Sequence, residues 1–254
     1  MPTNRRDRDA ASTVLAGRRP VVELLRARRG AEKIFIASGM SSSSVLTEIR
    51  KRADEAAIPV RVVPRAEVDR LAEGENHQGV VALTGRYRYT PLEELFSDAA
   101  KVVFLDGVTD PHNLGSLLRT VECCGFDGVV VPAHRSAGVN GTVRRISAGA
   151  AEIVRVARVP NLGRSLEQAK EAGLWIVGLD GEAPDDIWSS DLVEPPIGLV
   201  LGAEDRGLSR SVREHCDGLV RIPQKGRIGS LNVGVAGAIA MFEIARRSSS
   251  SASL

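Results

Sequence analysis

The chain has few of the features that mark membrane, disulfide-bonded or metal-binding proteins. It contains no apolar run near the roughly eighteen residues that a membrane-spanning helix needs, and its start, MPTNRRDRDAAST, lacks the apolar core of a secretory signal. Its cysteines, Cys123, Cys124 and Cys216, have no metal-ligand spacing, so we expect reduced and mostly buried thiols. Its four histidines form no His-x3-His pattern, which argues against zinc. We therefore expect a cytoplasmic protein that binds neither a metal nor a membrane.

Net charge is also small, but it is unevenly distributed. The formal charge is +2 over 254 residues, and 43% hydrophobic with 26% charged residues is ordinary for a globular protein. Residues 1–29, however, hold eight arginines and three acids, a local charge of +5. This stretch fits a footprint for a phosphate backbone, and it fits equally well a solvated helix face with a flexible tail.

The first part of the chain predicts a small α/β unit over residues 14–86, after a flexible basic tail over 1–13. We expect helices over 20–29, 45–57 and 65–71, and strands over 33–37, 60–63 and 79–83. Residues 87–99 resemble a linker. Around the start of this linker, Tyr87 and Tyr89 alternate with Arg86 and Arg88. This alternation suits base stacking and phosphate contacts, although we favour a strand edge or hinge.

The second part predicts a larger α/β unit over residues 100–247, followed by a flexible tail over 248–254. Strands are expected over 101–105, 128–131, 174–178, 197–201 and 219–222, with helices over 114–125, 140–150, 164–172, 208–215 and 231–247. Strands that alternate with helices of about ten residues favour a largely parallel, doubly wound sheet. Two strand ends and a helix N-terminus converge near 198–209 and 221–246, which indicates a small-molecule pocket at the carboxyl edge of that sheet.

Three segments carry a family resemblance: LDGVTDPHNLGSLLRTVECCGFDGVVVP (105–132), GLVLGAEDRGLS (198–209) and RIPQKGRIGSLNVGVAGAIAMFEIAR (221–246). The chain resembles the SpoU (TrmH-type) RNA ribose 2′-O-methyltransferases, above all those that methylate a guanosine of 23S rRNA. The likeness covers most of residues 14–247. It implies a C-terminal trefoil-knotted SPOUT methyltransferase domain, a small N-terminal RNA-binding domain similar to ribosomal proteins, S-adenosylmethionine as cofactor, and a homodimer formed through the knotted domain.

The resemblance also assigns catalytic residues: Asn113, Arg119, Glu204, Ser230 and Asn232. It implies that Ser230 and Asn232 orient Arg119 and the substrate, and that Glu204 holds Arg119 or neighbouring backbone in place. Arg119 would act on the attacking ribose hydroxyl as a base or as an orienting, charge-stabilising group. Each residue type also has an ordinary structural use. A buried asparagine ties down a loop, an acid suits a helix N-terminus, and a serine is a good helix N-cap.

For the cofactor, the resemblance points to residues of the predicted pocket: Leu201, Gly202, Ile222, Pro223, Ser230 and Leu231. Gly202 would let an adenosine group approach closely, although any sharp turn also favours glycine. Gln224 and Gly234 depart from the family, which commonly has methionine and serine there. We expect activity to survive, and Gly234 to weaken its helix by up to about 1 kcal/mol.

For the RNA, we expect contacts from basic residues of both units: Arg18, Arg19, Arg26, Arg28, Arg29, His77, Arg144 and Arg145. Other RNA targets stay open, namely a tRNA ribose or an rRNA nucleotide whose methylation blocks an antibiotic. A nucleotide-dependent oxidoreductase would need a G-x-G-x-x-G turn, which LDGVTDPHNLGS does not supply. A non-catalytic RNA-binding protein would tolerate loss of the five catalytic positions, and all five are filled.

Overall fold

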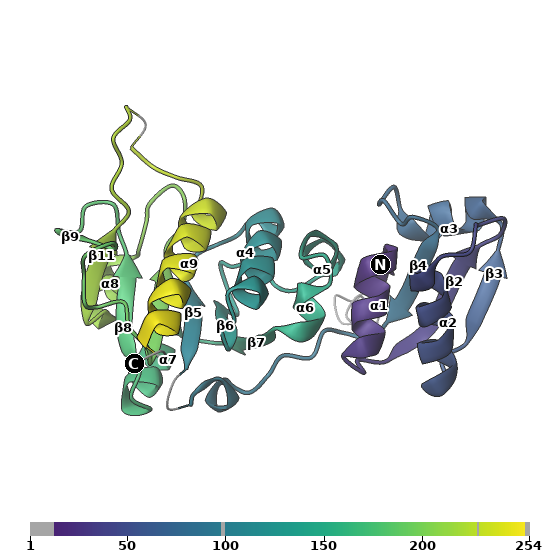
Figure 1. The fold of residues 1–254 in the computed structure, drawn as a ribbon, viewed down its shortest axis with the longest axis horizontal. Helices are drawn as coiled ribbons and strands as arrows, with labels where there is room; N and C mark the ends of the chain where they lie inside the picture. The colour runs from purple at the N-terminus through teal and green to yellow at the C-terminus, as the bar shows by residue number, and fades with distance from the viewer. Residues whose placement is uncertain (1–12, 98–99, 228, 252–254) are drawn as a thin grey trace, which may run out of the picture. The chain divides into compact units, whose positions relative to one another are not determined.

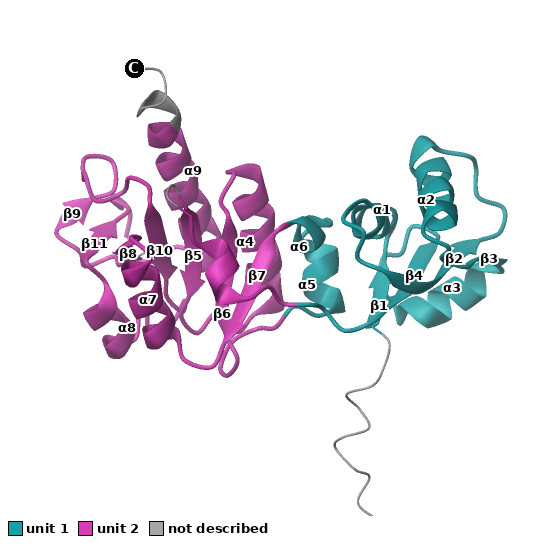
Figure 2. Ribbon diagram, turned by 90° about the horizontal axis from the view of Figure 1, so that it is seen from below, with its two compact units in different colours: residues 1–88, 139–153 teal, residues 89–138, 154–254 magenta. Residues whose placement is uncertain are grey.

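The computed structural model of the chain describes residues 13–97, 100–227 and 229–251. Contacts divide it into two compact units, shown in separate colours in Figure 2. Unit 1 comprises the chain up to Arg88 together with Val139–Ile153, and unit 2 comprises Tyr89–Gly138 with the chain from Val154 onward. The segment 139–153 lies within the stretch predicted as the second domain, yet its helices pack on elements of unit 1.

Unit 1 is built on a four-stranded mixed sheet in the order β1-β4-β2-β3. Its strands are β1 (Thr13–Ala16), β2 (Ala31–Ala37), β3 (Val60–Val63) and β4 (Val80–Thr84), and its first helices are α1 (Arg18–Arg26), α2 (Ser44–Glu55) and α3 (Arg65–Ala72). Helices α1 and α2 bury Leu24 and Ile49 with Ile34 of the sheet, whereas α3 buries Val68 in a separate cluster with Ala16 and Val81. The sheet therefore has helices on both faces.

Local backbone chemistry explains where the helices of unit 1 begin and end. Ser43 caps α2 by accepting a hydrogen bond from the Leu46 amide at 3.3 Å. The prediction for the first helix was displaced, because α1 begins at Arg18 and ends at Arg26. The chain then takes a left-handed turn at Arg28, where φ is 52°, before it reaches Gly30.

The predicted helix 140–150 is two short helices, α5 (Gly141–Ile146) and α6 (Ala150–Ile153). The break falls at Ala148 and Gly149, whose φ angles of 53° and 98° are left-handed. A Cβ on Gly149 would lie 2.8 Å from the Cβ of Glu23 in α1, so only glycine allows this approach. Helix α5 packs beside β1 and α6 beside α1.

Unit 2 contains a seven-stranded sheet in the order β7-β6-β5-β10-β8-β11-β9, and every neighbouring pair is parallel. The strands are β5 (Lys101–Leu105), β6 (Gly128–Pro132), β7 (Arg155–Val159), β8 (Trp175–Leu179), β9 (Asp185–Asp186), β10 (Ile197–Leu201) and β11 (Gly218–Arg221). The helices are α4 (Pro111–Cys123), α7 (Leu162–Glu171), α8 (Arg210–His215) and α9 (Val233–Ser251), and a 3-10 helix spans Leu92–Leu95. The predicted α/β fold with a parallel sheet is confirmed, although β1, β7 and β9 were not foreseen.

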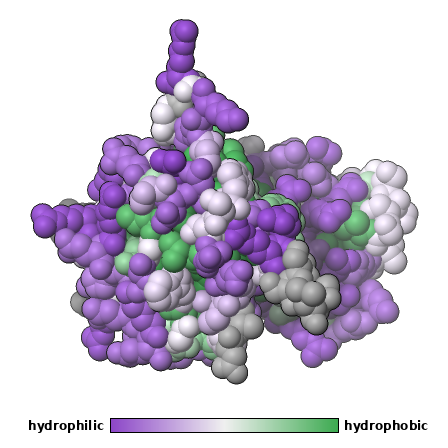
Figure 3. Space-filling view, turned by 60° about the vertical axis from the view of Figure 1, so that its left-hand side comes forward, coloured by the Kyte–Doolittle hydropathy of each residue, from purple (hydrophilic) through white to green (hydrophobic). Residues whose placement is uncertain are grey.

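The last helix, α9, lies beside α4 in unit 2 (Figure 1). It begins at Val233 rather than near Ser230, and it runs to Ser251, so residues 248–251, predicted as part of a tail, continue the helix. One face buries Ala240, Met241 and Ile244, while Val235 and Phe242 are 49% and 55% exposed. Figure 3 shows hydrophobic surface bordered by hydrophilic side chains. Within the described ranges, no helix has the length and hydrophobicity to cross a bilayer.

The thiols differ in exposure more than predicted. Cys123 is exposed on α4, Cys124 is buried and Cys216 is half-buried. Burial is the main cause that raises the pKa of Cys124 to about 11 and the pKa of Cys216 to about 12. These two thiols therefore stay protonated at neutral pH and make poor nucleophiles.

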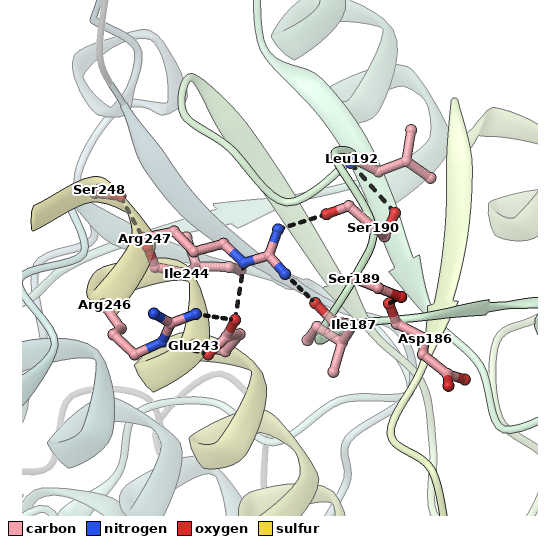
Figure 4. Close-up of polar contacts among 10 residues, drawn as sticks. All are labelled: Asp186, Ile187, Ser189, Ser190, Leu192, Glu243, Ile244, Arg246, Arg247 and Ser248. Atoms are coloured by element: carbon pink, nitrogen blue, oxygen red, sulfur yellow. Dashed lines mark hydrogen bonds and ion pairs between the residues drawn. The ribbon is translucent and has the colours of Figure 1, made fainter. Parts of the chain in front are cut away.

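An arginine near the end of α9 fixes the helix to the loop that follows β9 (Figure 4). Arg247 donates to the carbonyl oxygens of Ser190 and Ile187, at 2.6 and 2.9 Å, and to Glu243 at 2.8 Å. Glu243 is 8% exposed, and hydrogen bonds from Arg246 and Arg247 lower its pKa to about 2. Its stabilisation is complete above its ordinary pKa and is lost as the pH falls toward about 2.

Replacing Arg247 with alanine is expected to destabilise the protein by about 1–3 kcal/mol, because two carbonyl acceptors and a buried carboxylate lose a charged donor. Urea denaturation at pH 7 measures this difference. Arg246→Ala is the matched control, since Arg246 binds the same carboxylate from a side chain that is 64% exposed. It should cost less than 1 kcal/mol. Equal losses in the two variants would contradict a special role for Arg247.

Candidate active site

The sheet of unit 2 brings the ends of three strands to one edge. Leu201, the last residue of β10, pairs in register with Leu105 of β5 and Leu179 of β8. The amide of Asp106 donates to the Leu201 carbonyl at 2.8 Å, which ties the loop after β5 to the end of β10. Because carboxyl ends of parallel strands meet at the same edge, their loops form the expected place for a ligand.

Helix α4 leads Asn113 into this edge. Asp110 caps the helix by accepting a hydrogen bond from the His112 amide at 2.8 Å, and Pro111 occupies the first helical position. The helix therefore starts three residues before the predicted residue 114. Asn113 stands in the first turn and is 8% exposed.

The loop after β10 is a tight turn that carries Glu204. Ala203 and Gly207 exchange backbone hydrogen bonds of 3.0 and 2.8 Å. A Cβ on Gly202 would collide with the backbone of Gly207, so the turn itself requires glycine there. The need for glycine at position 202 is therefore explained by the sharp turn, one of the two roles expected for it. Glu204 lies in the exposed part of this turn.

Asn232, and not Ser230, caps α9. Its Oδ1 accepts hydrogen bonds from the amides of Gly234 and Val235 at 2.9 and 3.3 Å. The Val233 amide donates instead to Glu204, at 3.3 Å. Three amides at the start of the helix, which have no partner within it, are thereby satisfied.

The Asn232 amide also joins the three sequence motifs. Its Nδ2 donates to Oδ1 of Asn113 at 3.0 Å and to Oε1 of Glu204. The orientation of the amide is determined by its surroundings, because a flip would point its NH2 group at the two amides of α9. We refer to Asn113, Glu204 and Asn232 as the amide network.

Arg119 lies outside the amide network. It is exposed in the third turn of α4, and its guanidinium makes no hydrogen bond or ion pair within the described part of the chain. Six residues separate it from Asn113, a rotation of about 240° around the helix, so the two cannot share a face. Of the two roles expected for Glu204, the structure has it holding neighbouring backbone, the Val233 amide, while Asn232 binds Asn113 and Glu204. That these residues orient Arg119 stays a prediction.

A pocket adjoins the amide network. It is lined by residues from the ends of β8, β10 and β11 and from the start of α9: Leu179, Asp180, Gly181, Leu201, Gly202, Ala203, Glu204, Gly207, Ile222, Gln224, Gly229, Ser230, Leu231, Val233 and Ala236. Of the predicted cofactor residues, Pro223 alone is not in the lining. Gln224, which stands where the family commonly has methionine, is part of this wall.

The pocket suits an adenosyl sulfonium. Its walls are mostly aliphatic, as a purine and ribose require, and the carboxylates of Asp180 and Glu204 suit a positive charge. Added Cβ atoms on Gly181 and Gly229 would meet nothing within 4 Å, so open space lies beside the backbone there. In the described residues, no group of three or more His, Cys, Asp or Glu side chains could hold a metal ion.

Gly234 has a packing role that its sequence did not reveal. An added Cβ would lie 3.1 Å from Oδ1 of Asn232 and 3.6 Å from Oγ of Ser116 in α4. The missing side chain leaves room for the cap and for close approach of the two helices. The expected helix weakening is therefore offset in part by these contacts.

Several residues predicted to bind RNA have partners within unit 1. His77 is 6% exposed and binds Asp69 at 2.7 Å and the Gly79 amide at 2.9 Å. Arg144 is 3% exposed and pairs with Glu152 at 2.5 Å.

The other predicted arginines reach the surface to different degrees. Arg26 pairs with Glu23 and Glu48, Arg145 with Glu75, and Arg18 donates to the Gln78 carbonyl. Arg19 and Arg28 are exposed, and Arg29 is half-buried. The basic tail before residue 13 lies outside the described residues.

Comparison with known proteins identifies the chain. A family model described as the SpoU rRNA methylase family matches residues 100–242. The chain belongs to this family. A second model, for RNA 2′-O ribose methyltransferase substrate binding, matches residues 14–90 of this SpoU methylase. The prediction of an RNA methyltransferase of the SpoU family is thus confirmed.

Individual relatives of this SpoU methylase agree. It is 44% identical over 224 residues to the 23S rRNA (guanosine-2′-O-)-methyltransferase RlmB of Pseudomonas aeruginosa, which covers 85% of this chain and 88% of that one. It is 42% identical to an uncharacterized tRNA/rRNA methyltransferase of Mycolicibacterium gilvum, over 92% of this chain and 76% of that one. The fold matches that of the SpoU methyltransferase AviRb from Streptomyces viridochromogenes in complex with AdoMet, with a TM-score of 0.80, 24% identity, and coverage of 97% and 94%.

Replacing Asn232 with aspartate is expected to destabilise the SpoU methylase by about 2–3 kcal/mol at pH 7, since a carboxylate would face Glu204 in place of an N–H donor. Thermal or urea denaturation measures the loss. Asn232→Ser is the control, because serine keeps the helix cap but is too short for its single O–H to replace the Nδ2 bridge to Asn113 and Glu204, and it should cost about 1 kcal/mol. An aspartate variant as stable as the serine variant would contradict the amide network.

Proposed function

We propose that this chain methylates the ribose 2′-hydroxyl of a guanosine in 23S rRNA, with S-adenosylmethionine as methyl donor. The observation that carries the proposal is the amide network, which joins all three motifs of the SpoU family beside the pocket. The 44% identity to a 23S rRNA guanosine methyltransferase supports the choice of target. S-Adenosylmethionine, when bound, supplies an already activated methyl group.

The protein then has to align the reacting atoms rather than activate them. The aliphatic walls exclude water, and Glu204 presents a carboxylate to the pocket from a turn that Gly202 and Gly207 hold tight. Asn232 fixes the wall formed by the start of α9. Arg119 offers planar N–H donors from the surface of α4, where they suit an RNA ribose or phosphate.

We assign Arg119 the role of orienting the ribose and stabilising the charge that develops on its oxygen. A guanidinium carries only donors, so this role needs no unusual proton loss. We propose residues 14–86 as the RNA-docking domain and 100–247 as the methyltransferase domain. We also propose the trefoil knot that the family implies, in the domain where α9 packs on α4 and its Arg247 binds the 187–190 loop.

Labelled S-adenosylmethionine and unmodified 23S rRNA test the activity, with ribose-methylation sequencing of the product. We expect one 2′-O-methyl guanosine. Arg119→Ala should lower the rate roughly 100-fold or more, because it removes donors to developing charge. Cofactor binding should not change, since Arg119 does not line the pocket. Arg119→Lys keeps the positive charge but not the planar arrangement of N–H donors, so its rate should lie between those of the wild type and Arg119→Ala.

Other outcomes of this experiment separate the parts of the proposal. Transfer to tRNA but not to 23S rRNA would contradict the target and retain the chemistry. If no RNA is methylated although the protein binds the cofactor, the proposed activity is contradicted, and Gln224 in the pocket wall is the first residue to test. A full-rate Arg119→Ala variant would contradict the role of Arg119.

We also propose a homodimer that forms through α9 of unit 2. Val235, Ala238, Ile239 and Phe242 follow the spacing of one helix face, and all are exposed or half-buried. An apolar stripe on a helix is the usual mark of a covered interface.

Phe242→Glu is expected to convert the dimer to monomers, because it places a charge in an apolar interface. Sedimentation velocity measures the change. Trp188→Glu is the matched control, since Trp188 is similarly exposed at 47% but lies outside α9. Dissociation by both variants, or by neither, would contradict an interface on α9.

A further inference from the structure

A second pocket lies wholly within unit 1, and nothing described above uses it. Its volume is about 370 Å³, in the range of ligand sites in general. Its wall comes from the end of α1 and the turn after it, the end of β4 with the residues that follow, and helices α5 and α6. Five arginines and two glutamates line it: Arg28, Arg29, Arg86, Arg88, Arg144, Glu32 and Glu152.

The deepest polar group is a carboxylate with an unused oxygen. Glu152 is 1% exposed, and its Oε1 accepts from Arg144 Nε at 2.5 Å. Arg144 is itself fixed by a second hydrogen bond, from Nη1 to Oγ1 of Thr84 at 2.6 Å. Among the described residues, Oε2 of Glu152 has no hydrogen-bond partner. A buried acceptor without a donor costs about 1–3 kcal/mol, so its persistence requires an explanation.

A donor in the same wall is also unused. Nη1 of Arg29 is buried and finds no hydrogen-bond partner in the described part of the chain. The Arg29 guanidinium lies 4.8 Å from the centre of the Tyr87 ring. The Tyr87 hydroxyl donates to the Ala151 carbonyl at 3.0 Å, which holds the ring in place. The pocket thus offers a flat, supported surface together with one free acceptor and one free donor.

We propose that this pocket receives one unpaired nucleotide of the RNA substrate, an inference that rests on the proposed function. The edge of a nucleobase carries donors and acceptors side by side, and so complements Glu152 Oε2 and Arg29 Nη1 together. Unpaired bases commonly stack on aromatic rings and guanidinium planes. Arg28 and Arg88 at the pocket suit the phosphates on either side.

The carboxylate argues against a simple anion site. A bare phosphate would be attracted by the arginines but repelled by Glu152, and it has no N–H donor for the free oxygen. Double-stranded RNA keeps its Watson–Crick edges paired and its bases stacked, so it cannot insert a base into the pocket. Both unused atoms are covered by the wall, so entry of a base requires long arginine side chains to turn aside.

The test is binding of a fluorescein-labelled single-stranded RNA ten-mer and of a ten-base-pair RNA duplex to the full-length chain, followed by fluorescence anisotropy. Arg29→Ala should weaken single-strand binding roughly tenfold, as the loss of a stacking surface does elsewhere. Arg61→Ala is the matched control: it removes the same charge from an exposed site on β3 outside the pocket. It should change single-strand binding less than twofold, and the two variants should affect the duplex alike.

Glu152→Gln tests the acceptor itself. Glutamine keeps an oxygen for Arg144 but presents N–H where Oε2 stands, and single-strand binding should fall about fivefold. If circular dichroism shows that this variant is unfolded, Arg28→Ala at the pocket rim replaces it, with an expected threefold to fivefold loss. Cytidine 5′-monophosphate should compete with the labelled strand, whereas ribose 5-phosphate, which lacks the base, should not.

The inference is overturned if Arg29→Ala binds the single strand as the wild type does, if single strand and duplex weaken equally, or if ribose 5-phosphate competes as well as the nucleotide. Methyl transfer measured on the same proteins separates the two claims. A wild type that transfers no methyl group, but whose single-strand binding depends on Arg29, loses the proposed function and keeps the pocket. If the wild type transfers methyl groups but the pocket variants bind the single strand as the wild type does, the proposed function is retained and the nucleotide pocket is rejected.

Discussion

The active-site architecture of unit 2 depends on one side-chain amide, that of Asn232. Its oxygen caps the N-terminus of α9, and its nitrogen donates to Asn113 in α4 and to Glu204 in the loop after β10. Only one orientation of the Asn232 amide lets its oxygen accept both of the α9 amide hydrogen bonds while its NH2 group donates to Asn113 and Glu204. The amide therefore fixes the relative positions of three separate chain segments, because its hydrogen bonds are directional and apolar packing is not.

Around that amide, the parallel sheet and the close backbone contacts form the pocket. In-register pairing of β5, β8 and β10 brings their ends to a common edge. The contact between Gly202 and Gly207 narrows the turn that carries Glu204. Close backbone packing thus defines the wall of the pocket proposed for the cofactor, while the groups expected to meet RNA, such as Arg119, remain on the surface.

Much of this arrangement was predictable from sequence. Strong apolar runs such as Lys101–Leu105 and Ile197–Leu201 predicted their strands to the residue, and the motifs predicted which segments converge. Short elements with weak patterns, such as β7 and β9, were missed. The role of Asn232 was also missed, because Ser230 and Asn232 are both good N-caps and only the start of α9 distinguishes them. Contacts across 60 or more residues, such as Arg144 with Thr84, leave no local signal.

The shared use of Glu204 has a thermodynamic consequence. The same carboxylate lines the pocket and accepts the first amide of α9, so occupancy of the pocket and formation of the helix N-terminus are linked equilibria. By mass action, any molecule that binds only the folded pocket raises the midpoint of unfolding with its concentration. Ligand recognition in unit 2 can therefore be followed as a melting-temperature shift, with neither RNA nor turnover required.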